Sequence, residues 1–532
     1  MELCTDRRKQ IMGLMLGGAI GDALWAPVEH KWIGTFPEVD DYQITSRFYQ
    51  GEWTADTALN LCVAESLLRC EGVNLEDQMH NFLKWHFSGY LGTRSYAKGE
   101  GKQTKSILNN YFYYKLKPRE HDISWSMLDG NGSLMRIGAI AAFYWDPRDY
   151  IDEKKSDHSF WKRKIDSLRW DLQRSPFARC SANTHNSILC NYVCHIMGRT
   201  IRSILIGIDK EKILKSLEDV NFLCTLQVFY WNAVKVEKEN YDEIYDTFDA
   251  LIKIMRGGYK VSGPEIIDPK GAWFAFVLNT MRVVLRWFYH FDTFEEGMKA
   301  VVNLWWDANT NACVYGYLAW AYYGEDAIPE KWKKNLMDGE LIQAFGEALY
   351  NHNSIDENIL NRKRYDLQRF QEVQEKYGNQ ACTELKKGHK TQKRQMFYCF
   401  PPIATIGKEE GQSKIFSLSC AEEVKEYLEN DFLRENLYQY CDLLGDEETE
   451  KVREIFDEND REILHSCMTV FHLENPKDEH FIKVLQKYFN GILHSNTKKI
   501  YSFMKEDYIV SGDVIMGHDL LTEADAFSDL PF

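Results

Sequence analysis

The sequence predicts an all-α protein with two folded units and a short acidic tail. Apolar residues recur at helical spacing in one segment after another, while the alternating pattern of β-strands is sparse throughout. At 532 residues the chain is longer than a single domain usually is. Its composition turns polar around residues 356–364, so we expect a first unit at 1–350, a second unit at 364–501 and a tail at 502–532.

The expected helices of the first unit follow from this spacing. A helix over 56–70, for example, places Leu59, Cys62 and Val63 on one mainly apolar stripe. The apolar run at 272–291 is interrupted by polar residues, which favours a buried helix with a polar edge over a membrane span. By the same reasoning we expect helices over 7–24, 56–70, 75–87, 104–115, 134–144, 183–206 and 210–233.

Charge and cysteine content narrow the class of protein. A formal net charge of −16 argues against broad binding of nucleic acid, whose phosphates it would repel. The 13 cysteines are scattered without Cys-x-x-Cys spacing, which is typical of reduced thiols in the cytoplasm. The apolar run at 11–24 follows three basic residues, but it contains Gly18, Gly21 and Asp22, so we expect neither a signal peptide nor a membrane anchor.

Two short polar runs stand directly before expected helices: Thr54-Ala55-Asp56-Thr57, and Asp307-Ala308-Asn309-Thr310-Asn311. Their side chains offer hydroxyl, carbonyl and carboxylate oxygens, which suit a hard cation such as Mg²⁺ better than zinc. Thr, Asp and Asn are also the commonest residues that cap a helix N-terminus. From the residues alone, a metal site formed by both runs and a simple pair of caps therefore both remain open.

Glycines are dense between residues 89 and 104, and Gly130-Asn131-Gly132 forms a second glycine-rich turn. Glycine lets backbone N–H groups approach an anion such as a diphosphate closely, although an ordinary flexible connection explains the first loop equally well. Arg136 follows the second turn, where it is placed either to pair with a phosphate or to hold an internal partner.

In this order, the motifs resemble the ADP-ribosylglycohydrolase family, which includes enzymes that release ADP-ribose from modified proteins. The resemblance covers residues 10–335 and implies an ADP-ribosylglycohydrolase-like orthogonal helical bundle. It rests on Gly17-Gly18-Ala19-Ile20-Gly21-Asp22-Ala23-Leu24, Gly51 to Thr57, Gly99-Glu100-Gly101-Lys102-Gln103-Thr104, Gly130-Asn131-Gly132-Ser133-Leu134-Met135-Arg136, Thr184-His185, Asp307-Ala308-Asn309-Thr310 and Ile328-Pro329 with Trp332.

Carried over residue by residue, the resemblance implies a site for one or two Mg²⁺ ions beneath the ribose of ADP-ribose or of an ADP-ribosylated protein. The catalytic carboxylates would be Glu29, Asp56 and Asp307. Thr54, Asn309 and Thr310 would join Asp56 and Asp307 as metal ligands. The implied substrate-binding residues are Gly99, Gly101, Asn131, Gly132, Ser133, Met135 and His185.

Two carboxylates of the family pattern are missing, because Ala55 and Asn309 stand where aspartates are expected. Ala55 is either an engineered change in an active hydrolase, or part of a natural decay that leaves a reader able to bind ADP-ribose without cutting it. A third explanation is that a single metal suffices. All three remain open at this point, so the resemblance predicts a hydrolase acting on modified arginine or serine, with a catalytically impaired reader as the alternative.

A second resemblance covers residues 364–501. Tyr365-Asp366-Leu367, the run at 393–403 and Tyr427-Leu428 are similar to a small bacterial domain of unknown function. Its family usually has Trp where Gln395 and Phe397 stand. We expect this unit to be mostly helical, with its aromatic residues forming a core.

Overall fold

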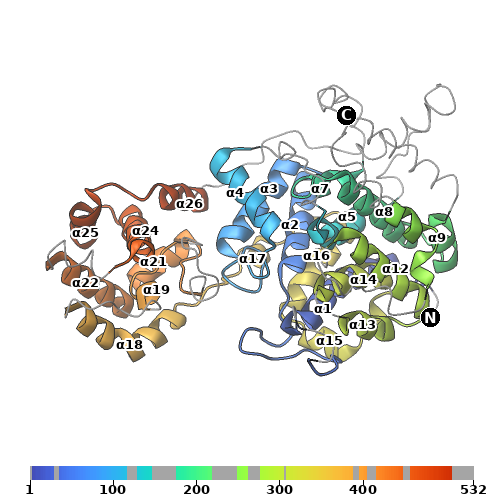
Figure 1. Cartoon of the computed structure of the whole chain (residues 1–532), viewed down its shortest axis with the longest axis horizontal. Helices are drawn as coiled ribbons and strands as arrows, with labels where there is room; N and C mark the ends of the chain where they lie inside the picture. The colour runs from blue at the N-terminus through green and yellow to red at the C-terminus, as the bar shows by residue number, and fades with distance from the viewer. Residues whose placement is uncertain are drawn as a thin grey trace. The chain divides into compact units, whose positions relative to one another are not determined.

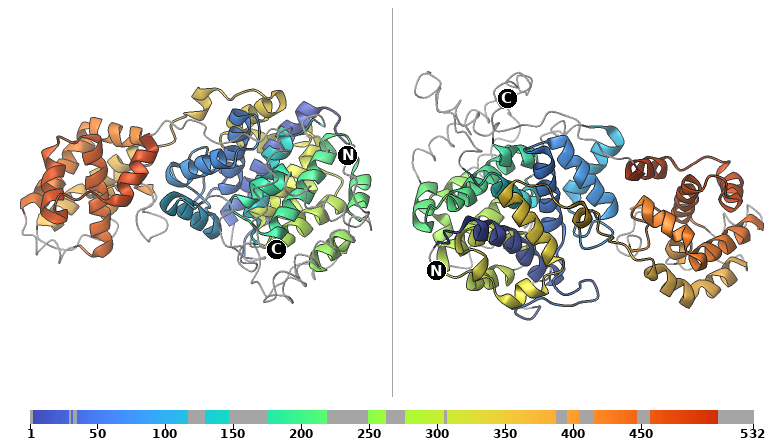
Figure 2. Two further views of the ribbon diagram at one scale, coloured as in Figure 1. Left: turned by 90° about the horizontal axis from the view of Figure 1, so that it is seen from above. Right: turned by 180° about the vertical axis from the view of Figure 1, so that it is seen from behind.

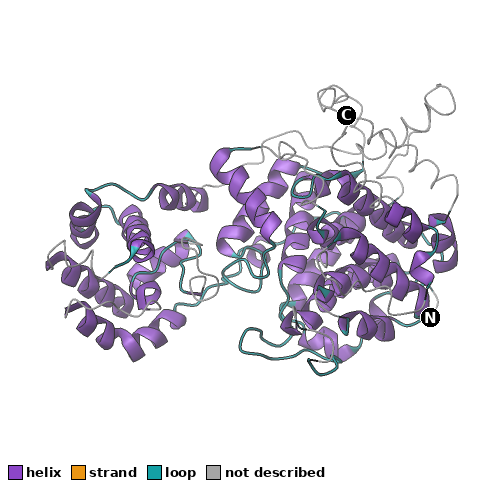
Figure 3. Cartoon of the chain, viewed as in Figure 1, coloured by secondary structure: helices purple, strands orange, loops and turns teal. Residues whose placement is uncertain are grey.

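The computed structural model describes residues 3–28, 31, 35–116, 129–146, 175–218, 249–261, 276–304, 307–386, 395–403, 415–446 and 456–505. Within these ranges the chain forms helices, turns and loops, and it contains two isolated bridges but no strand (Figure 3). The predicted all-α class is confirmed. Glu29, most of the expected helix over 210–233 and the end of the chain from residue 506 lie outside the described residues.

The chain divides into two compact units, each with its own core. The second unit comprises the described residues after Arg362 together with the earlier segment Lys84–Lys98, and the first unit comprises the rest. In Figures 1 and 2, helices α18 to α26 of the second unit, orange to red, form a bundle of their own.

Helix α1 (Arg7–Trp25) is the central helix of the first unit and packs antiparallel against α14 (Ala308–Tyr323). Their backbones touch at glycines spaced one turn apart. A Cβ added at Gly17 would lie 2.8 Å from the Gly316 carbonyl oxygen, and one at Gly21 would lie 2.3 Å from the Ala312 carbonyl oxygen. Since position 21 meets an earlier residue of α14 than position 17 does, the end of α1 reaches the start of α14.

The described residues include one helical stretch, 7–28, whose length and hydropathy would allow it to cross a membrane. Its most apolar window is entirely buried inside the protein. This burial agrees with its role as the central helix of the first unit.

Two expected helices differ from the structure. The helix expected over 134–144 begins with a 3₁₀ segment, η2 (Asn131–Arg136), before α5 (Ile137–Phe143). The helix expected over 183–206 starts late: α8 (Ile188–Leu205) begins only after Ser187, and a short helix that was not expected, α7 (Pro176–Ala182), precedes it. The late start has a local cause, because the Ser187 hydroxyl accepts a hydrogen bond from the Cys190 backbone and caps a new helix.

Three further helices lie close to the expected ranges: α2 (Ala55–Cys70), α3 (Leu75–Ser88) and α4 (Lys102–Tyr114). The last residues of α3, from Lys84, group with the second unit. α9 (Lys210–Leu217) begins where the helix over 210–233 was expected, and α12 (Val277–His290) lies within the apolar run at 272–291. No range is predicted for the remaining helices, which are η1 (Ala26–Val28), η4 (Gly258–Lys260), α13 (Phe294–Val302), η6 (Glu325–Ala327), α15 (Glu330–Asn335), α16 (Gly339–Asn351) and α17 (Glu357–Leu360).

The second unit is a helical bundle around packed aromatic rings. The Tyr427 ring lies 5.3 Å from Phe370 and 5.2 Å from Phe471, centroid to centroid, and all three side chains are buried. These aromatics form a core, as predicted. The helices are α18 (Gln368–Lys386), α19 (Gln395–Cys399), α21 (Ala421–Glu429), α22 (Asp431–Asp446), α24 (Glu458–Glu474), α25 (Glu479–Phe489) and α26 (Ser495–Lys505).

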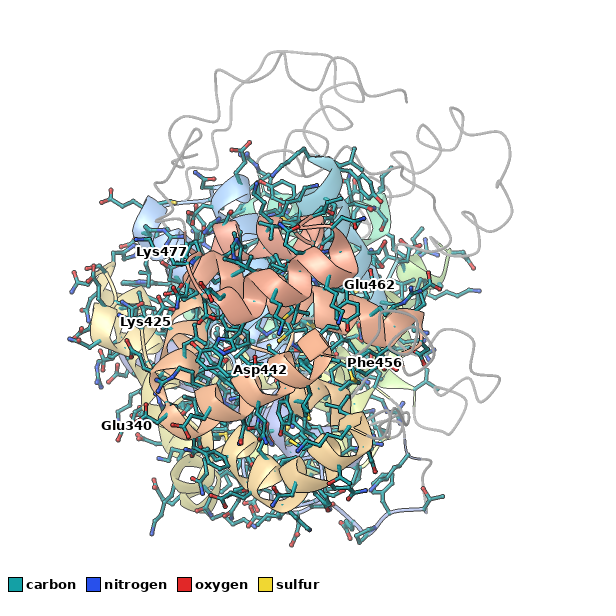
Figure 4. All side chains as sticks on the ribbon, turned by 90° about the vertical axis from the view of Figure 1, so that its left-hand side faces the viewer. Glu340, Lys425, Asp442, Phe456, Glu462 and Lys477 are labelled. Carbon is teal, nitrogen blue, oxygen red and sulfur yellow. The ribbon has the colours of Figure 1, made fainter. Side chains whose placement is uncertain are left out.

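The outside of the second unit carries exposed side chains of both charges. Figure 4 labels Lys425, Asp442, Glu462 and Lys477 on the face that it shows. Mixed charges of this kind are typical of a solvated surface.

Candidate functional site

Asp22 holds the first polar run in place. Its fully buried carboxylate, on α1, accepts hydrogen bonds from the backbone N–H groups of Thr54 (2.8 Å) and Thr57 (3.1 Å). The hydroxyls of the same two threonines also donate to it, at 2.7 and 2.8 Å. Burial raises the pKa of Asp22, although these four bonds oppose the shift. One carboxylate from α1 therefore fixes the start of α2.

The two polar runs meet at the starts of α2 and α14. The Asn309 side-chain amide donates to Asp56 Oδ2 at 3.4 Å, so the first turns of the two helices are in direct contact. On the other side, the Asn131 amide of η2 donates to Asp307 Oδ2 at 2.5 Å and to the Thr280 hydroxyl at 2.9 Å. Residues far apart in the sequence thus bring two carboxylates, Asp56 and Asp307, to one place.

Thr54 and Asp307 occupy the N-cap positions of their helices, but neither makes a side-chain capping bond. The Thr54 hydroxyl donates to Asp22 instead. The capping interpretation therefore explains where these residues stand in the chain but not what their side chains do. The Asp307 carboxylate is left with two side-chain neighbours, Asn131 and Thr310.

Burial raises the pKa of Asp307 to about 7, against the opposing effect of hydrogen bonds from Asn131 and Thr310. A carboxyl with this pKa, beside buried amides and with no cation of the protein paired to it among the described residues, is short of positive charge. A bound cation would supply that charge and lower the pKa again.

The polar side chains at the two helix starts are carboxylates, hydroxyls and amides, so each has an oxygen atom that could bind a metal ion. Asn309 is buried, and its Oδ1 has no hydrogen-bond partner within the described part of the chain; the same holds for Asn311 Oδ1. The same part contains no group of three or more His, Cys, Asp or Glu side chains arranged so that they could together hold a metal ion. Asp56 and Asp307, with neutral oxygens nearby, suit one hard divalent cation, because these two carboxylates balance its charge of +2.

The glycine-rich loop closes onto the same place. Gly99 has a φ of +75°, and a Cβ there would lie 2.9 Å from the Thr54 Cβ, so the loop packs directly on the first polar run. Gly101 is the N-cap residue of α4 and makes no side-chain cap, and a Cβ there would meet nothing within 4 Å. The first backbone N–H groups of this 13-residue helix therefore start beside open space, as an anion requires.

The predicted substrate-binding residues of η2 fall into two groups. Gly132 lies against His185: a Cβ at Gly132 would be only 2.8 Å from His185 Cε1. Ser133 and Met135 are buried; the Ser133 hydroxyl lies 3.0 Å from that of Ser181, and the Met135 carbonyl accepts from Tyr317 at 2.8 Å. Those two residues therefore hold the turn from inside the protein.

Three residues of this arrangement were not predicted as part of the site: Asp22, Gln103 and Thr280. Gln103, in the first turn of α4, donates to the Thr184 carbonyl oxygen at 3.0 Å. The signal for Asp22 was present in the sequence, because a single carboxylate inside an otherwise apolar helix needs several buried donors. Nothing in the sequence singled out Thr280.

Comparison with known proteins gives matches over both units. The family described as ADP-ribosylglycohydrolase matches residues 3–358, and the family described as "Protein of unknown function (DUF1810)" matches residues 364–501. The ADP-ribosylarginine hydrolase Tri1 of Serratia proteamaculans (strain 568) is 22% identical over 345 residues, 64% of this chain and 78% of the relative.

Two further relatives and two solved structures are also similar. The ADP-ribosyl-[dinitrogen reductase] glycohydrolase of Rhodospirillum rubrum is 24% identical over 61% of this chain and 89% of its own length. The ADP-ribosylhydrolase ARH3 of Gallus gallus is 23% identical over 65% of this chain and 92% of its own length. A structure described as an ADP-ribosylglycohydrolase-related protein complex has a TM-score of 0.47 and 28% identity, over 66% of this chain and 99% of that one. The structure of the conserved hypothetical protein Rv1873 of Mycobacterium tuberculosis has a TM-score of 0.25 and 26% identity, over 26% of this chain and 99% of that one.

Proposed function

The chain belongs to the ADP-ribosylglycohydrolase family, and we propose that it is a hydrolase that releases ADP-ribose from a modified arginine or serine side chain with one bound Mg²⁺ ion. Its relatives, an ADP-ribosylarginine hydrolase, an ADP-ribosyl-[dinitrogen reductase] glycohydrolase and an ADP-ribosylhydrolase, support the removal of ADP-ribosyl groups as the reaction class. The observation that carries the proposal is the meeting of Asp56 and Asp307 at two helix starts, beside an Asn309 carbonyl oxygen that has no partner in the described chain.

In this proposal Asp56 and Asp307 bind the cation, together with the Asn309 carbonyl oxygen and the hydroxyls of Thr54 and Thr310. When bound, Mg²⁺ would act as a Lewis acid and hold the ribose hydroxyls in a fixed pose. The open start of α4 after Gly101 supports a place for the diphosphate. Asn131 and Asn309 keep the two carboxylates at their positions through amide hydrogen bonds.

The chemistry is a hydrolysis at the anomeric carbon of the ribose. A carboxylate oxygen of the Asp56 and Asp307 pair accepts a proton from water as the water oxygen bonds to that carbon. The bond from the anomeric carbon to the acceptor side chain breaks, and the leaving nitrogen or oxygen takes up a proton. In this proposal the two carboxylates hold the attacking water in position beside the anomeric carbon.

The test is release of free ADP-ribose from proteins modified on arginine and, separately, on serine, with Mg²⁺ and with a chelator. We expect release that requires the metal and that falls by about 10²-fold or more in D307N. The control is D292N, an exposed aspartate that pairs with Lys210 and should leave the rate unchanged. No release from either acceptor, even by an A55D variant, would rule out the hydrolase.

A second candidate function is an ADP-ribose reader that does not cut, and the absence of two carboxylates at Ala55 and Asn309 favours it. Calorimetry distinguishes the two functions, because a reader binds ADP-ribose tightly with little dependence on metal and without turnover. Counting bound Mn²⁺ by electron paramagnetic resonance tests the metal separately. We expect one ion in the wild type and a second, more weakly bound ion in A55D, whose added carboxylate supplies part of the missing negative charge.

A further inference from the structure

Arg136 is a buried cation held by neutral oxygens. The side chain is only 1% exposed, and within the described residues no carboxylate pairs with it. Instead it donates to the carbonyl oxygens of Gly132 (3.1 Å) and Cys180 (3.0 Å) and to the Thr184 hydroxyl (2.7 Å). Arg136 therefore joins the η2 turn to α7 and to the segment that follows it.

The bond from Arg136 decides what the Thr184 hydroxyl does with its own hydrogen. The hydroxyl accepts from Arg136, which has no acceptor atom to offer in return. Its other side-chain neighbour in the described chain is His185 Nδ1, at 2.8 Å. The buried hydroxyl hydrogen thus has one acceptor within reach. Because an unpartnered buried donor is costly, Thr184 donates to Nδ1.

A histidine whose Nδ1 accepts a hydrogen bond carries its proton on Nε2 when it is neutral. Burial, and then the nearby positive charge of Arg136, hold the pKa of His185 well below its ordinary value, so the ring is neutral near pH 7. The Nε2–H points at the η2 turn, where Cβ atoms at Gly130 and Gly132 would lie 3.4 and 2.9 Å from it. A side chain at position 132 would cover this donor.

The geometry points to a relay in which Arg136 and Thr184 fix His185 as its Nε2–H tautomer, so that the ring donates a hydrogen bond to an oxygen of the bound ADP-ribosyl group. The identity of the ligand rests on the function proposed above, whereas the tautomer does not. Arg136 and Thr184 are positioning residues, and His185 is the residue that contacts the ligand. A phosphate or ribose oxygen is the acceptor that a fixed N–H recognises.

The tautomer can be measured on the full-length protein without any ligand. Carbon and nitrogen shifts of labelled histidines report which ring nitrogen is protonated, and the H185Q variant assigns the signal. We expect a neutral Nε2–H ring in the wild type and in T184S, which keeps the hydroxyl. In T184V, which keeps the shape and loses the hydroxyl, we expect the Nδ1–H form or a charged ring to appear.

Binding of ADP-ribose, measured by calorimetry, tests the donation. Loss of one hydrogen bond should weaken binding about tenfold in T184V and in H185N, whose amide is too short to replace Nε2–H. T184S and H185Q should stay within about threefold of the wild type. T184S also serves as the folding control, and the wild-type tautomer still decides the matter if T184V does not fold.

Three results would overturn the relay: a wild-type ring that is charged or protonated on Nδ1, an unchanged tautomer in T184V, or equal ADP-ribose affinity of T184V and the wild type. If the wild type does not bind ADP-ribose at all, the proposed function and the donation to that ligand both fall. The ligand-free spectra would still decide whether Arg136 and Thr184 fix the ring.

Discussion

Asp22 shows how much depends on one carboxylate. Two backbone N–H groups and two hydroxyls donate to it. In a D22N variant one oxygen becomes an amide that faces these donors, so we expect the free energy of unfolding to fall by about 2–4 kcal/mol in urea titrations. The exposed D292N control should change it by less than about 0.5 kcal/mol. Equal stability of D22N and the wild type would show that the threonines do not need this acceptor.

His195, on α8, should make the stability of the protein depend on pH. It is buried, neither ring nitrogen has a partner in the described chain, and burial lowers its pKa to about 3. Below pH 6.5 the unfolded chain takes up a proton that the folded protein excludes, so the folded state loses stability as pH falls, by up to about 1.4 kcal/mol per pH unit.

The measurement compares the wild type with H195M at pH 7 and pH 5. Between these values the wild type should lose about 2 kcal/mol more than the variant. Replacing the exposed His290 by methionine is the matched control and should keep the wild-type slope. Parallel slopes in wild type and H195M would mean that His195 takes up a proton as readily in the folded protein.

For single residues, the sequence predicted which side chains lie at the helix starts, but it did not predict their hydrogen-bond partners. It placed Thr54 and Asp307 before helices, and that is where they stand. It could not show that Thr54 bonds to Asp22 rather than to its own helix, because the two residues are 32 positions apart. Whether the predicted residues bind metal or substrate stays a prediction.

At the scale of elements, the contact between α1 and α14 makes a sharp prediction. A Cβ at Gly21 would lie 2.3 Å from the Ala312 carbonyl oxygen, a main-chain atom that cannot rotate away. G21A should therefore lower the free energy of unfolding by about 1–3 kcal/mol or prevent folding. G339A is the control, since its Cβ would have no neighbour closer than 3.7 Å. A stable G21A would mean that the two helices can separate without loss.

Helix periodicity predicted α1, α2, α3 and α4 to within a few residues, since burying one apolar stripe against a core requires that spacing. It failed at 183–187, where five consecutive polar residues form a turn and not the first turns of the expected helix. The decisive signal there was Ser187, whose hydroxyl starts a new helix.

For the whole molecule, we expect that most thiols of the native protein do not react with labelling reagents and that reducing agents do not change its stability. None of the 12 cysteines in the described residues forms a disulfide, and ten of them are buried. Burial raises the pKa of most of these thiols, Cys180 to about 11 for example, which removes the reactive thiolate. A cytoplasmic location stays a prediction.

Thiol labelling followed by mass spectrometry checks the expected reactivity of the thiols. In the native protein at pH 8, among these 12 thiols, the half-buried Cys4 should react first and the ten buried ones only after denaturation. The melting temperature should be the same with and without a reducing agent. Rapid labelling of Cys180 in the native protein would show that this side chain is not buried.

The division into two units was visible in the sequence as a change of composition, but one part of it was not. The segment Lys84–Lys98 groups with the second unit, although it lies inside the first in chain order. Composition is read along the chain, whereas compact units are defined by contacts in space. Exact domain boundaries therefore stay a prediction.

The glycine contact between α1 and α14 has one more consequence. Peptide groups have the same dimensions in every protein, so two helices that meet through their main chains are separated by a distance that side-chain substitutions elsewhere in the core hardly alter. The Thr54 and Asp307 runs are anchored to this rigid pair, through Asp22 on one helix and the first turn of the other. Substitutions elsewhere in the core should therefore lower the melting temperature before they change the distance between the Asp56 and Asp307 carboxylates.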